Sequence, residues 1–281
     1  MRLLAYLTII GVALATGTTF AQRSTGSDGT AIDLKDSNAI DTPSVELDVE
    51  PTEKAPLPPL PTPTNTGTKP VAPVSDENFD ELSNEQKKEV ATLLGDAARF
   101  VQGIRLQEAL SKLWEAEQIA PNIFQIHNLK GAAYTKMRDF VKARASFERA
   151  IKLVPGAFHA RFNLTEIDYV TGSYETAEKD FLKLLDAFPK TDISTRRLIE
   201  YKILICKLKR GDEDGAKKML AAYSYLDDTP VYYVANAAIA FNADDRDGAE
   251  SWITSARKIY PATQMEIFLD ALIEAGWIET L

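Results

Sequence analysis

The stretch that decides the fold is residues 124–189, which reads FQIHNLKGAAYTKMRDFVKARASFERAIKLVP and then GAFHARFNLTEIDYVTGSYETAEKDFLKLLDAFP. The second half repeats the spacing of the first at a step of about 34 residues. Small, aromatic and proline positions therefore recur in register, which predicts helical hairpins that stack on one another. The matching pairs are Phe124 with Phe158, Ala143 with Ala177, Phe147 with Phe181, and Pro155 with Pro189.

The same period extends in both directions from this stretch. Pro121 precedes Pro155 by the step that separates Pro155 from Pro189, and a proline ends a helix because it lacks an amide donor and clashes with the preceding turn. A fourth, degenerate unit has its turn at residues 211–214, and we expect about five inserted residues near 191–195. A fifth unit ends near Pro261, and a last amphipathic helix over residues 264–275 should stop at Gly276.

This spacing resembles that of the tetratricopeptide repeat (TPR) family over roughly residues 90–275. The unit from residue 124 matches the family's small, aromatic and proline positions, and it departs from the pattern at His127 and Lys130. The resemblance implies an all-α fold: a right-handed α-solenoid of about five helical hairpins with a C-terminal capping helix. The matching residues are Gly131, Tyr134, Ala143, Phe147, Ala150 and Pro155.

Residues 1–21 are typical of a secretory signal peptide. Arg2 supplies the positive start, an apolar run of about 13 residues follows, and the small residues Thr19 and Ala21 predict cleavage after Ala21. The apolar run is shorter than the roughly 20 residues that span a bilayer. We therefore expect a periplasmic or secreted protein with no stable membrane insertion after cleavage. A retained N-terminal anchor is the alternative.

Residues 22–77 have a different composition, rich in Pro, Thr and Ser, and are expected to be a disordered linker. Within it, residues 55–63 read APLPPLPTP and predict a locally extended polyproline spacer. The alternative is a docking motif, because two overlapping P-x-x-P patterns occur there. The repeat domain should then occupy residues 78–281, with its first helix capped by Ser83 and Gln86.

Composition and motifs argue against a catalytic or nucleic-acid-binding role. A formal net charge of −9 and the lack of a basic stripe disfavour nucleic acid as a partner. The single cysteine, Cys206, excludes an internal disulfide and lies in an apolar run that predicts a buried thiol. His127 and His159 have no metal-ligand spacing, so we expect no enzyme activity, no metal and no cofactor. An enzyme with a cryptic site at these two histidines remains the alternative.

The resemblance implies a protein or peptide partner bound by the first helices of the hairpins, which line the concave face in this family. The chain would then be a non-catalytic scaffold or adaptor in the cell envelope or outside the cell. A membrane-tethered envelope-assembly factor is the alternative. The aromatic candidates would anchor the partner, or else pack between neighbouring first helices. The candidate binding residues are Gln125, Asn128, Thr135, His159, Phe162, Glu166, Tyr169 and Phe241.

Overall fold

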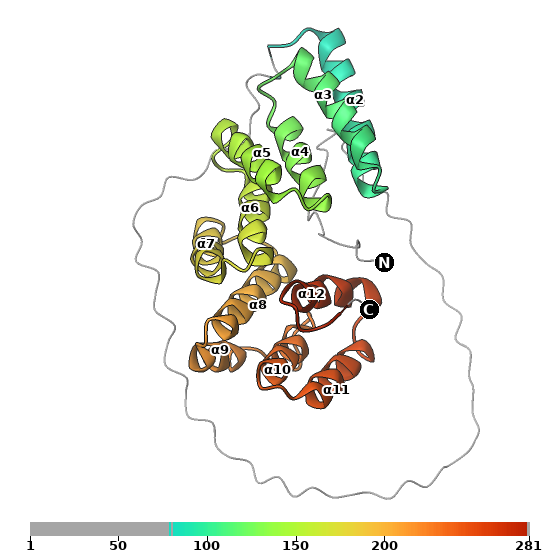
Figure 1. Cartoon of the computed structure of the whole chain (residues 1–281). Coiled ribbons are helices and arrows are strands. Elements are labelled where there is room, and N and C mark those ends of the chain that lie inside the picture. Colours follow the sequence, from blue (N-terminus) through green and yellow to red (C-terminus); the bar gives the residue numbers. More distant parts are fainter. Residues whose placement is uncertain (1–78, 80, 280–281) are drawn as a thin grey trace, which may run out of the picture. The chain divides into compact units, whose positions relative to one another are not determined.

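The structure is a computed structural model that describes Phe79 and residues 81–279 (Figure 1). The expected signal peptide at residues 1–21 and the linker at 22–77 lie outside these described residues. The described part of the chain contains eleven helices and no strand. None of these helices is both long enough and apolar enough to cross a membrane.

Consecutive helices pair as hairpins, and α12 follows the fifth pair (Figure 1). The predicted array of about five hairpins with a C-terminal cap is therefore confirmed. The hairpins are α2 (Asn84–Gln102) with α3 (Leu106–Ile119), α4 (Phe124–Lys136) with α5 (Phe140–Leu153), α6 (Phe158–Val170) with α7 (Tyr174–Ala187), α8 (Ile193–Lys209) with α9 (Glu213–Leu220), and α10 (Val231–Asn242) with α11 (Arg246–Arg257); α12 spans Ala262–Glu274.

The three prolines in register occupy equivalent corners of successive hairpins. Pro121 follows the end of α3 at residue 119 by two positions, and Pro155 and Pro189 follow the ends of α5 and α7 by the same distance. Each proline lies where a helix has just ended, as its missing amide donor requires. The period seen in the sequence is therefore the period of the hairpins.

Helix ends follow the local chemistry of their residues. Ser83 and Gln86 form the predicted capping box, with the Gln86 amide donating to the Ser83 hydroxyl at 3.2 Å and the Ser83 amide donating to Gln86 Oε1 at 3.1 Å. Asp245 caps α11 by accepting from the Gly248 amide at 2.9 Å. Gly276, with φ of +75°, follows α12 as expected, because glycine adopts left-handed conformations without strain.

The two helices of the second hairpin pack closely where a glycine faces an aromatic ring. A Cβ built on Gly131 of α4 would lie 2.5 Å from Cε1 of Phe147 on α5, closer than any packed side chain allows. Phe147 is fully buried, so its ring has no free space into which to retreat. The small residue in the TPR-like spacing is thus a packing requirement of this hairpin.

In the fourth hairpin, most of the predicted inserted residues lengthen the first helix, α8. Helix α8 has 17 residues where α4 and α6 have 13, which accounts for four of the extra residues. The fifth lies in the linker, because α8 begins four positions after Pro189 whereas α6 begins three after Pro155. The insertion therefore adds about one turn to α8. Helix α9 has 8 residues, against 14 in α5 and α7.

Helix α12 packs against α8, α10 and α11, and it also reaches the third hairpin (Figure 1). The Phe268 ring lies 5.8 Å from the Tyr201 ring of α8, measured between centroids. The Tyr169 hydroxyl of α6 donates to the Ala271 carbonyl of α12 at 2.7 Å. The cap of the array therefore contacts the first helices of three hairpins: the third, the fourth and the fifth.

Candidate functional site

Five polar residues on α4 and α6 form the candidate site, which we name the inner stripe: Gln125, Asn128, His159, Asn163 and Glu166. Gln125 and Asn128 are three residues apart, and the other three are spaced by four and three. These spacings place each set on one face of its helix. In the first helices of TPR-like hairpins this is the face expected to point inward.

Each residue of the inner stripe has a buried polar atom with no hydrogen-bond partner among the described residues. Asn128, Asn163 and Glu166 are more than nine-tenths buried. Most buried polar groups in folded proteins are paired, so a row of unpaired atoms along the facing sides of two neighbouring helices requires an explanation. The unpaired atoms are Gln125 Oε1, Asn128 Oδ1, His159 Nδ1, Asn163 Nδ2 and Glu166 Oε1.

A buried lysine joins the inner stripe to α12. Lys202 Nζ of α8 lies 2.9 Å from Glu166 Oε2 of α6 and 2.9 Å from Glu274 Oε2 of α12. The lysine side chain is only 4% exposed, and its ammonium lies 4.4 Å from the centroid of the Tyr169 ring. Burial lowers the pKa of Lys202, but the two carboxylates outweigh this effect and raise it above its usual value. The lysine is therefore a charged link between the third hairpin, the fourth hairpin and the capping helix α12.

Further charged groups surround this link. Burial raises the pKa of Glu166 to about 7, although Lys202 opposes the change. The pKa of Asp270, one turn before Glu274 on α12, also rises to about 7, because of burial and then repulsion from Glu274. Burial lowers the pKa of Lys136 on α4, and the charge of Asp270 opposes that shift. The resulting charge cluster holds three carboxylates and two lysines.

The Asp270 carboxylate gives the folded state a dependence on pH. Because its pKa is raised in the folded state, its favourable contribution is complete near pH 4 and is lost as pH rises to about 7. Asp270→Asn does not titrate there. We expect the unfolding free energy of this variant, relative to that of the wild type, to rise by roughly 1–2 kcal/mol between pH 5 and 7.5. Solvent screening of this partly exposed carboxylate keeps the change that small.

Urea denaturation at several pH values measures this difference. Asp180→Asn on α7 is the control, because its partner Lys183 is a solvent-exposed surface lysine. A constant difference between wild type and Asp270→Asn across this pH range would contradict the assignment. The charged groups that act on Asp270 are Glu274, Lys202, Glu266, Glu166 and Lys136.

The aromatic candidates have internal partners. Phe162 stacks on Phe158 at 6.0 Å between ring centroids, and Phe241 stacks on Trp277 at 6.4 Å. Tyr169 is fully buried and bonds to α12. The structure thus favours the packing alternative for these three rings, and their role as ligand anchors stays a prediction. Thr135 donates to the Gly131 carbonyl within its own helix at 2.8 Å.

Sequence reasoning selected four residues of the inner stripe, Gln125, Asn128, His159 and Glu166, and it missed Asn163. The missing residue lies four positions after His159 and three before Glu166, on the same face of α6. Helical spacing from those two residues was the evidence that could have identified it. The charge cluster gave no comparable evidence, because its members come from four separate helices.

The histidines and the cysteine have structural contacts. His127 Nε2 lies 2.8 Å from the Pro121 carbonyl oxygen, and burial lowers the pKa of His159. Within residues 79 and 81–279, no group of three His, Cys, Asp or Glu side chains could hold a metal ion. Cys206 is buried, as predicted, and burial raises the pKa of its thiol to about 12. Such a thiol is protonated and unreactive at neutral pH.

No protein-family model matches the sequence, and no curated protein matches it. Among solved structures, PilF of Pseudomonas aeruginosa is similar with a TM-score of 0.51 and 14% identity, over 69% of this chain and 90% of PilF. A tetratricopeptide repeat protein from Parabacteroides merdae has a TM-score of 0.49 and 14% identity, over 66% of this chain and 71% of that one. The stacked hairpins, the prolines repeated every 34 residues and the likeness to PilF together give the chain a TPR-like fold. At these identities the likeness concerns the fold alone.

MamA from Desulfovibrio magneticus, from its residue 41 to its end, has a TM-score of 0.49 and 17% identity, over 61% of this chain and 94% of that one.

The TPR-like fold explains why the first helices α4 and α6 lie next to each other. Stacked hairpins place equivalent faces of successive first helices side by side. The inner stripe is therefore contributed by equivalent faces of the first helices of two neighbouring hairpins.

Proposed function

We propose that this chain is a non-catalytic scaffold that binds a protein or peptide segment along the inner stripe. The observation that carries the proposal is the row of five buried polar atoms without partners in the described residues. Each such atom costs about 1–3 kcal/mol if it stays unpaired. An extended peptide presents alternating amide donors and carbonyl acceptors, which match the mixed donors and acceptors of the stripe.

Helix α12 limits where such a segment binds. It occupies the surface next to Tyr169 through the bond to Ala271, and Lys202 joins it to Glu166. The free part of the stripe is then Gln125 and Asn128 on α4 with His159 and Asn163 on the first half of α6. A partner held there is short, contacting two hairpins and not five.

A peptide library tests the proposal. Random heptapeptides displayed on phage are selected on the full chain, and the enriched peptides are titrated by calorimetry. We expect the double variant Asn128→Ala, Asn163→Ala to lose at least about tenfold in affinity, because each amide bond contributes roughly 1 kcal/mol. Asn236→Ala on α10, whose amide donates to the Tyr232 carbonyl at 2.8 Å, is the matched control.

Thermal melts separate binding from folding in the same variants. The double variant removes two buried amides, each of which has one polar atom without a partner in the described residues, so its melting temperature should stay close to that of the wild type. Enriched peptides that bind the wild type and the double variant equally would contradict the proposed site. So would a library that yields no enriched peptide.

Export belongs to the same proposal. The charged start, the apolar run and the small residues before position 22 support cleavage after Ala21 into a periplasmic or extracellular compartment. The expected linker at residues 22–77 would then precede the array as a spacer. Sequencing the N-terminus of the mature protein tests this: a start at Gln22 supports export, and a retained Met1 favours the tethered assembly factor.

A further inference from the structure

A cluster of large apolar side chains lies on the fifth hairpin and on the loop that enters it, away from the inner stripe. Neighbouring rings are in edge-to-face contact, with centroid distances from 5.4 to 6.5 Å. Most of these side chains are partly exposed on the outside of the core. We name this surface the aromatic patch: Tyr225, Leu226, Tyr232, Tyr233, Trp252 and Tyr260.

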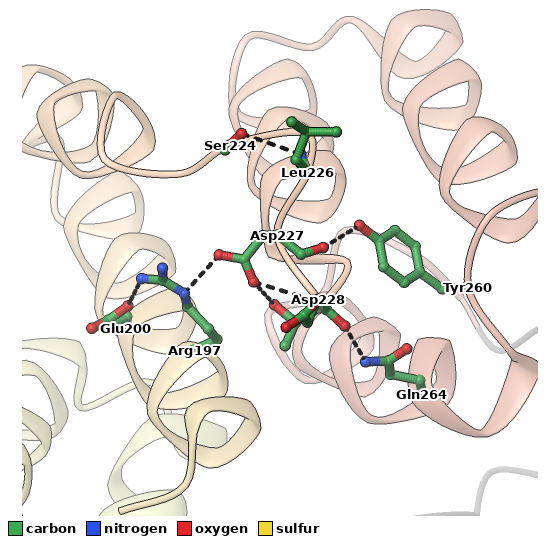
Figure 2. Close-up of polar contacts among 9 residues, drawn as sticks. Arg197, Glu200, Ser224, Leu226, Asp227, Asp228, Tyr260 and Gln264 are labelled. Carbon is green, nitrogen blue, oxygen red and sulfur yellow. Dashed lines mark hydrogen bonds and ion pairs between the residues drawn. The ribbon is translucent and has the colours of Figure 1, made fainter.

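The loop between α9 and α10 is held by side chains that bind its backbone carbonyls and the Asp227 carboxylate (Figure 2). Arg197 Nε of α8 lies 2.9 Å from Asp227 Oδ2. The Tyr260 hydroxyl donates to the Asp227 carbonyl at 2.8 Å, and Gln264 of α12 donates to the Asp228 carbonyl at 2.9 Å. Three separate parts of the fold therefore hold this loop.

The same loop presents apolar side chains to water. Tyr225 is 61% exposed and Leu226 is 75% exposed, although the residues that follow them are tied down. A loop that fixes large apolar groups in solvent gains nothing for folding, and contiguous exposed apolar surface marks an interaction site. Because the loop is already ordered, a partner would lose little entropy on binding there.

The ring geometry suits a polyproline helix. Such a helix rises about 3.1 Å per residue with three residues per turn, so prolines on one side repeat every 9 Å or so. The patch holds five aromatic rings in one network of edge-to-face contacts, which gives proline rings several apolar faces and edges to pack against. Proline-rich segments dock on aromatic-lined surfaces in this way, because their conformation is largely formed beforehand.

The chain itself contains a segment of this chemistry. Residues 55–63 hold five prolines and no charged side chain, so docking them would not desolvate a charge. The segment precedes the first hairpin, whereas the patch lies on the fifth, which shares no helix packing with α2. The intervening residues 64–78 would reach about 50 Å only when fully extended. A segment supplied by a second copy is free of that limit, and because association costs translational freedom its docking depends on protein concentration.

We propose that residues 55–63 of one copy of this chain dock on the aromatic patch of a second copy. Two copies that exchange these segments form a reciprocal dimer, in which each buries the other's patch. The dimer is separate from the inner stripe. Partner binding and self-association therefore use different surfaces of the same array.

Sedimentation equilibrium of the full chain over a concentration series tests the proposal. We expect concentration-dependent dimers that a synthetic peptide of residues 53–65 dissociates, and no effect from the same peptide with its prolines changed to alanine. Tyr225→Ser with Leu226→Ser should weaken the dimer at least about tenfold, because two exposed anchors are lost. Val141→Ser on α5, where Val141 is 83% exposed, is the matched control.

Three results would overturn the proposal. The chain could stay monomeric throughout the series, the double loop variant could dimerise like the wild type, or the alanine peptide could compete as well as the native one. Asn128→Ala with Asn163→Ala should leave the dimer unchanged, so failure of the proposed peptide site and failure of this dimer are measured separately.

Discussion

Lys202→Met is expected to destabilise the folded chain by about 3–5 kcal/mol, which is the cost of removing one member of a buried ion pair. The lysine is the shared partner of Glu166 and Glu274, at 2.9 Å from each. Its loss would leave two carboxylates facing each other with little water. The methionine retains most of the buried side-chain volume, so a packing defect would not explain a large effect.

Urea denaturation measures this change, and a surface lysine supplies the control. Lys183 pairs with Asp180 at 2.8 Å but is 76% exposed, so Lys183→Met should change stability by less than about 1 kcal/mol. Adding Glu166→Gln and Glu274→Gln to Lys202→Met should recover much of the lost stability, because the repelling charges are removed. Equal effects of Lys202→Met and Lys183→Met would show that the buried link contributes nothing.

Gly131→Ala is expected to lower the unfolding free energy by about 1–3 kcal/mol, the usual cost of adding a methyl group to a packed core. The new Cβ would lie 2.5 Å from Cε1 of Phe147. Because that ring is fully buried, α4 and α5 would have to move apart. Thermal or urea unfolding of the purified variant measures the loss.

Gly95→Ala is the matched control for this substitution. Gly95 also lies within a helix, α2, but an added Cβ there meets nothing within 4 Å. Alanine is the better helix former by about 0.5–1 kcal/mol, so this variant should be as stable as the wild type or more so. Equal stability changes for Gly131→Ala and Gly95→Ala would contradict the close packing of α4 against Phe147 of α5.

The parts of the fold that sequence reasoning predicted correctly are those fixed by local spacing. Pro121, Pro155 and Pro189 end helices because of their own covalent structure, wherever the chain packs. Gly131 and Phe147 mark the close contact within one hairpin, only 16 positions apart. Such features recur at one period, so the array is visible without coordinates.

The contacts of α12 could not be predicted in this way. The bond from Tyr169 to the Ala271 carbonyl joins residues 102 positions apart. Lys202 lies near an apolar run of α8, and no spacing rule relates it to residues 166 and 274. These contacts depend on the longer α8 and on the path of the chain after α11, which the repeat pattern does not specify. For this reason the sequence predicted an open binding face for the aromatic candidates, whereas α12 covers part of that face at Tyr169.

The packing of α12 on α6 and α8 is the central claim, because it determines which part of the inner face is left for a partner. Hydrogen exchange of the α12 backbone amides, followed by mass spectrometry, tests it most directly. We predict that these amides exchange as slowly as those of α6 and α8, since all three helices open together. Exchange of α12 within about tenfold of unprotected rates, with α6 and α8 still protected, would contradict the account.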